Sequence, residues 1–121
     1  MSDALLFAEA VVKVISGVRV DLTNEKATQA AIEAAFTKKG LPFKREVRLS
    51  SRDIPDFFAF DAVAVEVKIG GAKAAIFRQL GRYAAHERVK SLVLASNVPI
   101  ALPPTIEGKP CLLASLGAAW L

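Results

Sequence analysis

Two short stretches of the chain carry charged side chains in a spacing that suits metal-assisted chemistry. They are Ile-Pro-Asp-Phe at 54–57 and Val-Glu-Val-Lys at 65–68. Alternate side chains of a β-strand lie on the same face, so Glu66 and Lys68 are expected to point the same way. The valines at 63, 65 and 67 then point into the core, on the other face of the strand.

Asp56 is the third charged side chain of this group, ten residues before Glu66. A turn at Asp61 would make the two stretches neighbouring strands of a hairpin and bring the carboxylates within reach of one cation. Hard divalent cations such as Mg²⁺ are held by one or two carboxylates, waters and substrate phosphate oxygens. A lysine beside them can orient or activate a water. The alternative is an ordinary Glu/Lys pair on a surface strand; Pro-Asp upstream and Gly70-Gly71 downstream favour the chemical interpretation.

The pattern Pro55-Asp56…Glu66-Val67-Lys68 resembles the motif of the PD-(D/E)xK nuclease superfamily, which has the restriction-endonuclease-like fold. The resemblance spans about residues 23–96 and implies an α/β fold, with a three-layer core in which helices flank a mixed β-sheet. The short chain and the helix before the first strand are similar to Holliday-junction resolvases of the archaeal type and to virus-type replication-repair nuclease domains. Such enzymes cut phosphodiester bonds in DNA with Mg²⁺ or Mn²⁺, and the resolvases act as homodimers on branched DNA.

The resemblance also implies roles for individual residues. Asp56 and Glu66 would be the metal ligands, together with the backbone carbonyl of Val67. Lys68 would position the attacking water and stabilise charge on the phosphate.

Many members of the superfamily add an acid from the first core helix, and Glu25 and Glu33 compete for that role. Glu25 begins a series at i, i+4, i+7 and i+11, the spacing of a helix face that packs on a sheet. The other members of the series are Gln29, Ile32 and Phe36. Glu33 lies about 80° away around the helix, so we prefer Glu25 as a catalytic residue. The alternative is that Glu25 only stabilises the helix N-terminus, where the helix dipole favours an acid.

Gln79, Tyr83 and His86 follow at i, i+4 and i+7 on the helix after the Glu66–Lys68 strand. Gln79 and Tyr83 are similar to the QxxxY pattern of exonuclease-type branches, so Gln79 would hold the scissile phosphate or the attacking water. For Tyr83 we favour packing between helix and sheet. We assign no catalytic role to the only histidine.

Basic residues are concentrated just before the candidate site, in a chain with a net charge of +4 and a pI near 9.5. Such a cluster is either a solvated surface or a phosphate-binding surface, and the nuclease resemblance favours the second. Three further cations lie on the helix that follows the Glu66–Lys68 strand. The expected DNA-binding residues are Lys38, Lys39, Lys44, Arg45, Arg48, Arg52, Lys73, Arg78 and Arg82.

The length and composition fit a single domain over residues 1–121. A chain of 121 residues with 53% hydrophobic residues can bury one core. Its longest uncharged run, 91–106, contains three prolines and is too short for a membrane span. Asp3 and Glu9 stand where a signal peptide would be basic, and Cys111 is the only cysteine, so we expect a cytoplasmic protein without disulfides.

The expected element order is α-α-β-β-β-α-β-β. Thr23 is the expected N-cap of the second helix, and Gly40 is its expected end. The expected helices span 4–15, 23–39 and 72–87, and the expected strands span 45–49, 57–60, 62–69, 89–96 and 111–114.

Apolar residues in the first helix and in the C-terminal tail, which ends in Trp120-Leu121, predict a homodimer. The alternative is a well-filled monomer core. The resemblance predicts a structure-specific, metal-dependent DNA endonuclease. The alternatives are a catalytically silent DNA-binding module, and a nuclease of single strands or RNA. No motif for an organic cofactor is present.

Overall fold

The computed structural model describes residues 2–117, so the apolar end at Trp120-Leu121 lies outside the described residues. The chain forms three helices and six strands in this part. In chain order they are α1 (Asp3–Ser16), α2 (Glu25–Lys39), β1 (Phe43–Arg45), β2 (Phe57–Ala59), β3 (Val63–Lys68), α3 (Lys73–Ala84), β4 (Ser91–Ser96), β5 (Thr105–Ile106) and β6 (Lys109–Ser115).

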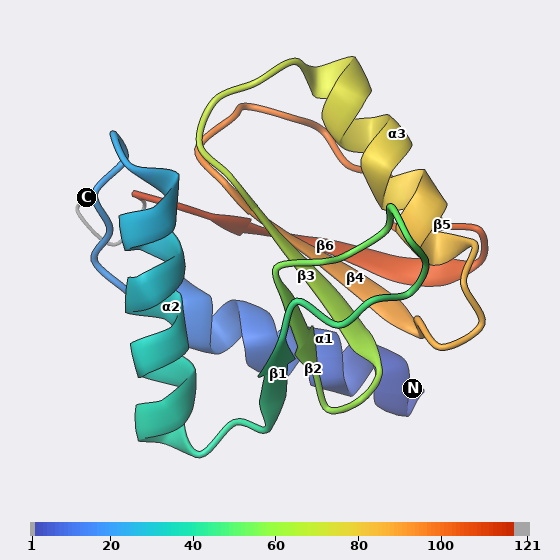
Figure 1. The fold of residues 1–121 in the computed structure, drawn as a ribbon, viewed down its shortest axis with the longest axis horizontal. Coiled ribbons are helices and arrows are strands. Elements are labelled where there is room, and N and C mark those ends of the chain that lie inside the picture. The colour runs from blue at the N-terminus through green and yellow to red at the C-terminus, as the bar shows by residue number, and fades with distance from the viewer. Residues whose placement is uncertain (1, 118–121) are drawn as a thin grey trace.

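The strands form one mixed sheet in the order β1-β2-β3-β4-β6-β5. β1, β2 and β3 pair antiparallel, whereas β3 pairs parallel to β4, and β4 pairs parallel to β6. The chain crosses from β3 to β4 through α3, as a parallel pair requires. Helices α1 and α2 pack on one face of the sheet and α3 on the other, so the expected three-layer α/β architecture is confirmed (Figure 1). None of these helices is long and apolar enough to cross a membrane.

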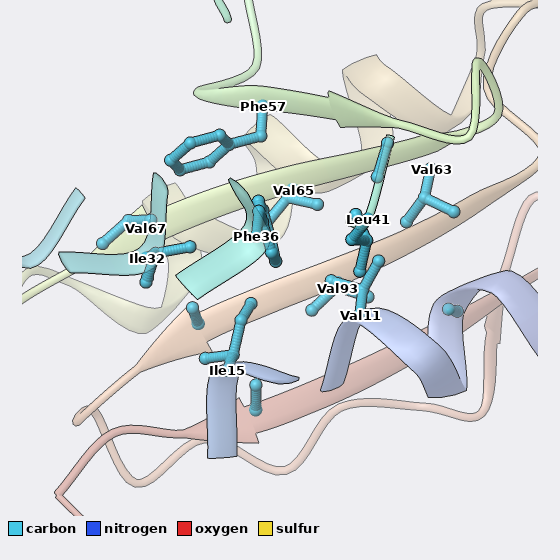
Figure 2. Packing of buried hydrophobic residues seen from close by; sticks show 14 of the residues in the cluster. Val11, Ile15, Ile32, Phe36, Leu41, Phe57, Val63, Val65, Val67 and Val93 are labelled. Atoms are coloured by element: carbon cyan, nitrogen blue, oxygen red, sulfur yellow. The ribbon is translucent and has the colours of Figure 1, made fainter. Parts of the chain in front are cut away.

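Two apolar clusters hold the layers together. On the α1/α2 face, Ile32 and Phe36 of α2 and residues of α1 pack against the odd-numbered valines of β3, including Val65 and Val67 (Figure 2). These side chains are fully buried, and each contributes about 1.5–3 kcal/mol. The opposite cluster places Leu80 and its α3 neighbours over the sheet. The expected direction of the β3 valines is therefore confirmed.

The start of α2 differs by one residue from the expectation. The N-cap is Asn24, whose side-chain oxygen accepts the Ala27 N–H at 3.0 Å. Thr23 instead precedes the cap, and its N–H and hydroxyl both donate to the Asp21 carboxylate. The expected end is confirmed, since Gly40 closes α2 with a left-handed φ of 69°.

The prediction of a strand over 45–49 was wrong. β1 ends at Arg45, because Glu46 adopts a left-handed φ of 51° and turns the chain away from β2. Val47 and Leu49 instead pack on the α3-side cluster from an irregular loop over 46–56. The Leu49 N–H donates to the Asp53 carbonyl at 2.9 Å, which supports the loop from within. The short strand β5 was not predicted.

The expected turn after β2 is present. Phe60 and Asp61 both have positive φ, 55° and 53°, and the Ala62 N–H donates to the Ala59 carbonyl at 3.0 Å. Consecutive positive φ values make a tight turn, although such positions favour Asn and Gly, and the three residues 60–62 connect Ala59 to its partner Val63. The turn sets the register that pairs Phe57 with Val65.

Much of the apolar surface behind the homodimer prediction is buried within the chain. Val11 and Ile15 of α1, and Ile106 and Leu116 near the C-terminus, are all less than 9% exposed. Leu6 of α1 remains 48% exposed. The homodimer stays a prediction.

Candidate active site

The hairpin register brings the two charged stretches together at the end of β3. Glu66 lies on the α3 side of the sheet and is 4% exposed. Its Oε1 accepts the Asp56 backbone N–H at 3.4 Å, and its Oε2 lies 3.3 Å from Lys68 Nζ. The structure therefore brings Asp56, Glu66 and Lys68 into one cluster.

Two carboxylates complete the hydrogen bonding of β3 where β2 no longer covers it. β2 pairs with β3 only as far as Val65, so the next N–H groups on the β2 side of the strand have no partner in β2. Asp56 Oδ2 accepts the Val67 N–H at 2.7 Å. Glu25 Oε1 accepts the Ile69 N–H at 3.1 Å. Glu25 is thus placed on the same edge as Asp56, and the first turn of α2 contributes to the site.

The carbonyl of Val67 belongs to the same edge. The N–H and C=O of one strand residue point toward the same neighbouring strand. Since the Val67 N–H points to Asp56, its carbonyl also faces the Asp56 side. The groups expected to bind metal are the carboxylates of Asp56 and Glu66 and the carbonyl of Val67. They therefore come from neighbouring residues at the end of β3.

Burial and like charge shift both carboxyl groups toward the protonated form. Burial is the main cause that raises the pKa of Glu66 to about 7, and the Asp56 charge adds to it, against hydrogen bonding from Tyr83 and attraction by Lys68. The pKa of Asp56 is also raised, first by burial and then by the Glu25 charge, although the Val67 N–H opposes the shift. A site with these properties is stabilised by any added cation.

Tyr83 supports Glu66 from α3. Its hydroxyl donates to Glu66 Oε1 at 2.9 Å and accepts from Gln79 Nε2 at 3.0 Å. Burial and the adjacent Glu66 charge raise the pKa of Tyr83, so the phenol stays protonated. The expected packing between helix and sheet is confirmed, since Tyr83 is 1% exposed. The hydrogen bond to Glu66 was missed, although the i, i+4 spacing of Gln79 and Tyr83 pointed to that face.

A hollow of about 330 Å³ opens beside Lys68 between the end of β3 and α3. Arg78, Gln79 and Arg82 line it from α3, together with the glycine turn at Gly71. Three cations and one amide face the same space, next to the carboxylate cluster. This arrangement suits an anionic group such as a phosphate.

Arg82 is held in place by an acid that sequence reasoning missed. Asp53, 7% exposed, accepts Arg82 Nε at 3.0 Å and lies 2.9 Å from His86 Nε2. The hydrogen bond with His86 is the main cause that lowers the pKa of Asp53. Asp53 thereby fastens the 46–56 loop to α3. Two features of the sequence could have pointed to this contact: Asp53 is an acid in a basic stretch, and Arg82 and His86 are spaced at i, i+4.

Arg45, one of the expected DNA-binding residues, turns its guanidinium toward α2 and the Asp56 backbone. It donates to Glu33 Oε1 at 2.6 Å, to Gln29 Oε1 at 2.8 Å and to the Asp56 carbonyl at 3.0 Å. Its guanidinium also lies 4.6 Å from the centre of the Phe57 ring. Glu33 is therefore the ion-pair partner of Arg45, whereas Glu25 is the helix acid that reaches the site.

The other basic residues do not form one cluster. Lys38 and Lys39 lie at the C-terminal end of α2, opposite the end that carries Glu25. A 15-residue helix separates its ends by about 20 Å. The remaining exposed cations flank the site on β1, the 46–56 loop and α3: Lys44, Arg48, Arg52, Lys73 and Arg78.

The acidic side chains near the cluster are few. Within residues 2–117, no group of three or more His, Cys, Asp or Glu side chains is gathered in a way that could hold a metal ion. Asp56 and Glu66 form a pair of carboxylates, and Mg²⁺ is commonly held by one or two carboxylates with water and substrate oxygens completing the shell. Their oxygen donors and raised pKa values fit Mg²⁺ or Mn²⁺.

Comparison of the chain with protein-family models, curated proteins and solved structures finds no significant match.

Proposed function

We propose that this protein is a divalent-metal-dependent endonuclease that hydrolyses phosphodiester bonds in DNA, with a site similar to that of the PD-(D/E)xK superfamily. One observation carries the proposal: Asp56 and Lys68, both partly buried, meet the buried Glu66 beside a hollow lined by arginines. A purely structural strand end has no need of a buried carboxylate, Glu66, beside a partly buried one, Asp56, of the same charge. The proposal includes a cytoplasmic location, where DNA is accessible.

Asp56, Glu66 and the Val67 carbonyl would hold the cation, with Glu25 as the nearby acid from α2. A bound Mg²⁺ or Mn²⁺ would supply Lewis acidity at the phosphate and lower the pKa of water.

The side chains around the cluster have separate tasks. Lys68, 3.3 Å from Glu66, carries a positive charge at the edge of the hollow and would stabilise the developing charge on a phosphate. Gln79 lines the same hollow and is fixed by its hydrogen bond to Tyr83, so its amide would orient the phosphate or the water. Tyr83 holds Glu66 in place.

Structure-specific recognition is the favoured form of the activity. The chain has six strands and three helices in its described part and no inserted segment that could read bases along a groove. The exposed cations around the site would instead contact phosphates. We therefore expect branched DNA, bound by a homodimer, to be cut in preference to plain duplex.

Cleavage of labelled four-way junction, flap, single-stranded and linear duplex DNA, with Mg²⁺, with Mn²⁺ and with EDTA, tests this function. Glu66→Gln and Lys68→Gln are each expected to lower the cleavage rate about 10²–10³-fold or more. The controls are Glu87→Gln and Lys90→Gln, which change exposed residues away from the cluster. Symmetrical cuts across the junction would support the resolvase-like form. Equal cutting of every substrate would retain the nuclease and remove the branch preference.

A second candidate is a DNA-binding module without catalysis. It is favoured by the structural use of the acids, since Asp56 and Glu25 already accept the backbone N–H groups of Val67 and Ile69 at the end of β3. This module would bind the same DNA substrates without metal-dependent cleavage. Binding by folded protein with no cut product under either metal would replace the endonuclease proposal with this one.

A further inference from the structure

A second hollow, of about 840 Å³, lies on the α1/α2 face between the C-terminal halves of the two helices. Its floor and walls are largely apolar and include Val14, Val18, Leu41, Pro42 and Phe60. Binding sites for small organic molecules commonly have volumes of about 300–1,000 Å³ and apolar linings with a few polar groups at defined positions. The hollow has both properties.

The polar groups at its edge are all positive. Lys13 of α1 and Lys38 and Lys39 of α2 line the hollow, and no acidic side chain does. All three lysines are exposed, and none makes an ion pair within residues 2–117. Lysines are favourable at helix C-termini, but that preference does not account for the apolar floor between them.

Phe60 is held in a costly conformation at the wall of this hollow. Its φ of 55° is unusual for a bulky side chain, and a left-handed backbone costs about 1–2 kcal/mol there. Its N–H donates to the Pro42 carbonyl at 2.9 Å, and its ring stacks on Phe7 with the centroids 4.5 Å apart. The turn between β2 and β3 imposes this conformation and thereby fixes an aromatic surface in the lining.

The hollow is separate from the proposed cleavage site. Lys38 and Lys39 lie at the far end of α2 from Glu25, about 20 Å along the helix axis. The 330 Å³ hollow beside Lys68 lies against α3, on the opposite face of the sheet. A ligand in the larger hollow would therefore leave the carboxylate cluster open.

We propose that the 840 Å³ hollow binds a small amphipathic organic anion. Its carboxylate, sulfate or phosphate group would lie among Lys13, Lys38 and Lys39, and its apolar body would cover Val14, Val18 and the Phe60 ring. Nucleic acid fits this site poorly, because a phosphate backbone has no apolar body to bury. Organic cations fit poorly for a different reason, because the three lysines at the edge would repel them.

Titration of ¹⁵N-labelled protein with decanoate, below its micelle concentration, tests the proposal by NMR. Decyltrimethylammonium serves as the probe with the same chain and the opposite charge. The variant replaces Lys13, Lys38 and Lys39 by Gln. The matched control replaces the exposed Lys26, Lys44 and Lys90 by Gln, so that the net charge changes equally.

Saturable decanoate shifts centred on residues 14–18 and 41–42, weakened about tenfold or more in the triple variant and not in the control, would support the site. Weaker binding of the cationic probe is also expected. Equal binding of both probes, equal weakening in the control, or no saturable shift in this region would overturn it. Co-sedimentation with phosphatidylglycerol vesicles in the absence of saturable decanoate binding would assign the lysines to a membrane surface and also overturn it.

Discussion

Glu66→Gln is expected to stabilise the metal-free protein at high pH. In the wild type, Glu66 is buried, and its pKa rises from the ordinary 4.5 to about 7 on folding. The folded state therefore binds a proton more tightly than the unfolded state, and stability falls as the pH rises from 4.5 through 7. Glutamine has the same shape, is neutral at every pH, and can still hydrogen bond to Tyr83.

The size of the effect follows from the shift. At about 1.4 kcal/mol per pKa unit, ionising Glu66 costs the folded state about 3 kcal/mol once the pH is above 7. The two proteins should have similar free energies of unfolding near pH 4.5. The variant should become more stable than the wild type by about 3 kcal/mol at pH 8.

Urea denaturation in EDTA at pH values from 4.5 to 8 measures this difference directly. Comparing the two proteins at each pH removes the contribution of titrating groups that do not interact with Glu66, and Glu87→Gln serves as the exposed control. Added Mg²⁺ should stabilise the wild type at pH 8 through binding to the folded state, and should leave Glu66→Gln unchanged. Parallel stability curves for wild type and Glu66→Gln would refute the reasoning, since Glu66 would then ionise like a surface carboxylate.

Three further predictions concern substitutions at single positions. Tyr83→Phe removes the hydroxyl that donates to Glu66 and should cost about 1–2 kcal/mol in urea denaturation at pH 8; a stability equal to wild type would contradict that hydrogen bond. Gly40→Ala and Gly81→Ala should have opposite effects on Tm, because an added Cβ meets no atom within 4 Å at either position, but only Gly40 has positive φ. The first should lose about 1 kcal/mol, and the second should gain about 0.5–1 kcal/mol. Asp53→Asn should cost about 1–2 kcal/mol and speed hydrogen exchange in the 46–56 loop; unchanged exchange there would mean that the loop is held by its apolar side chains alone.

The hairpin of the candidate site was predictable because its signals are local. Strict alternation around Glu66 identifies the buried face of β3, and the apolar run beginning at Phe57 identifies β2. A turn between them then sets which residues meet. The meeting of Asp56 with Glu66 follows from strand geometry alone.

The partners of the charged side chains were not predictable in the same way. Arg45 and Arg48 are close in a basic stretch, yet one is turned onto Glu33 and Gln29 while the other stays exposed. The difference depends on how α2 packs beside β1, which no local pattern encodes. The same holds for Asp53, whose partners lie 29 residues away on α3 and 33 residues away just after it.

The predicted end of the strand that begins at β1 was wrong for a related reason. Alternation of Arg45, Val47 and Leu49 predicts a strand, but the positive φ of Glu46 ends the pairing. Val47 and Leu49 still reach an apolar cluster, by crossing over the α3 side of the sheet. The two apolar side chains are therefore partly buried, but from a loop and not from the expected strand.

The carboxylates that cap β3 have a consequence for solubility. A strand that extends past its neighbour presents free N–H groups, and these are the template on which another chain can add a strand. Asp56 and Glu25 occupy two such groups, on Val67 and Ile69, with negative charges. Removing either acid would uncover a pairing edge as well as change the site. Alanine variants at these positions are therefore expected to aggregate more readily than the isosteric amides.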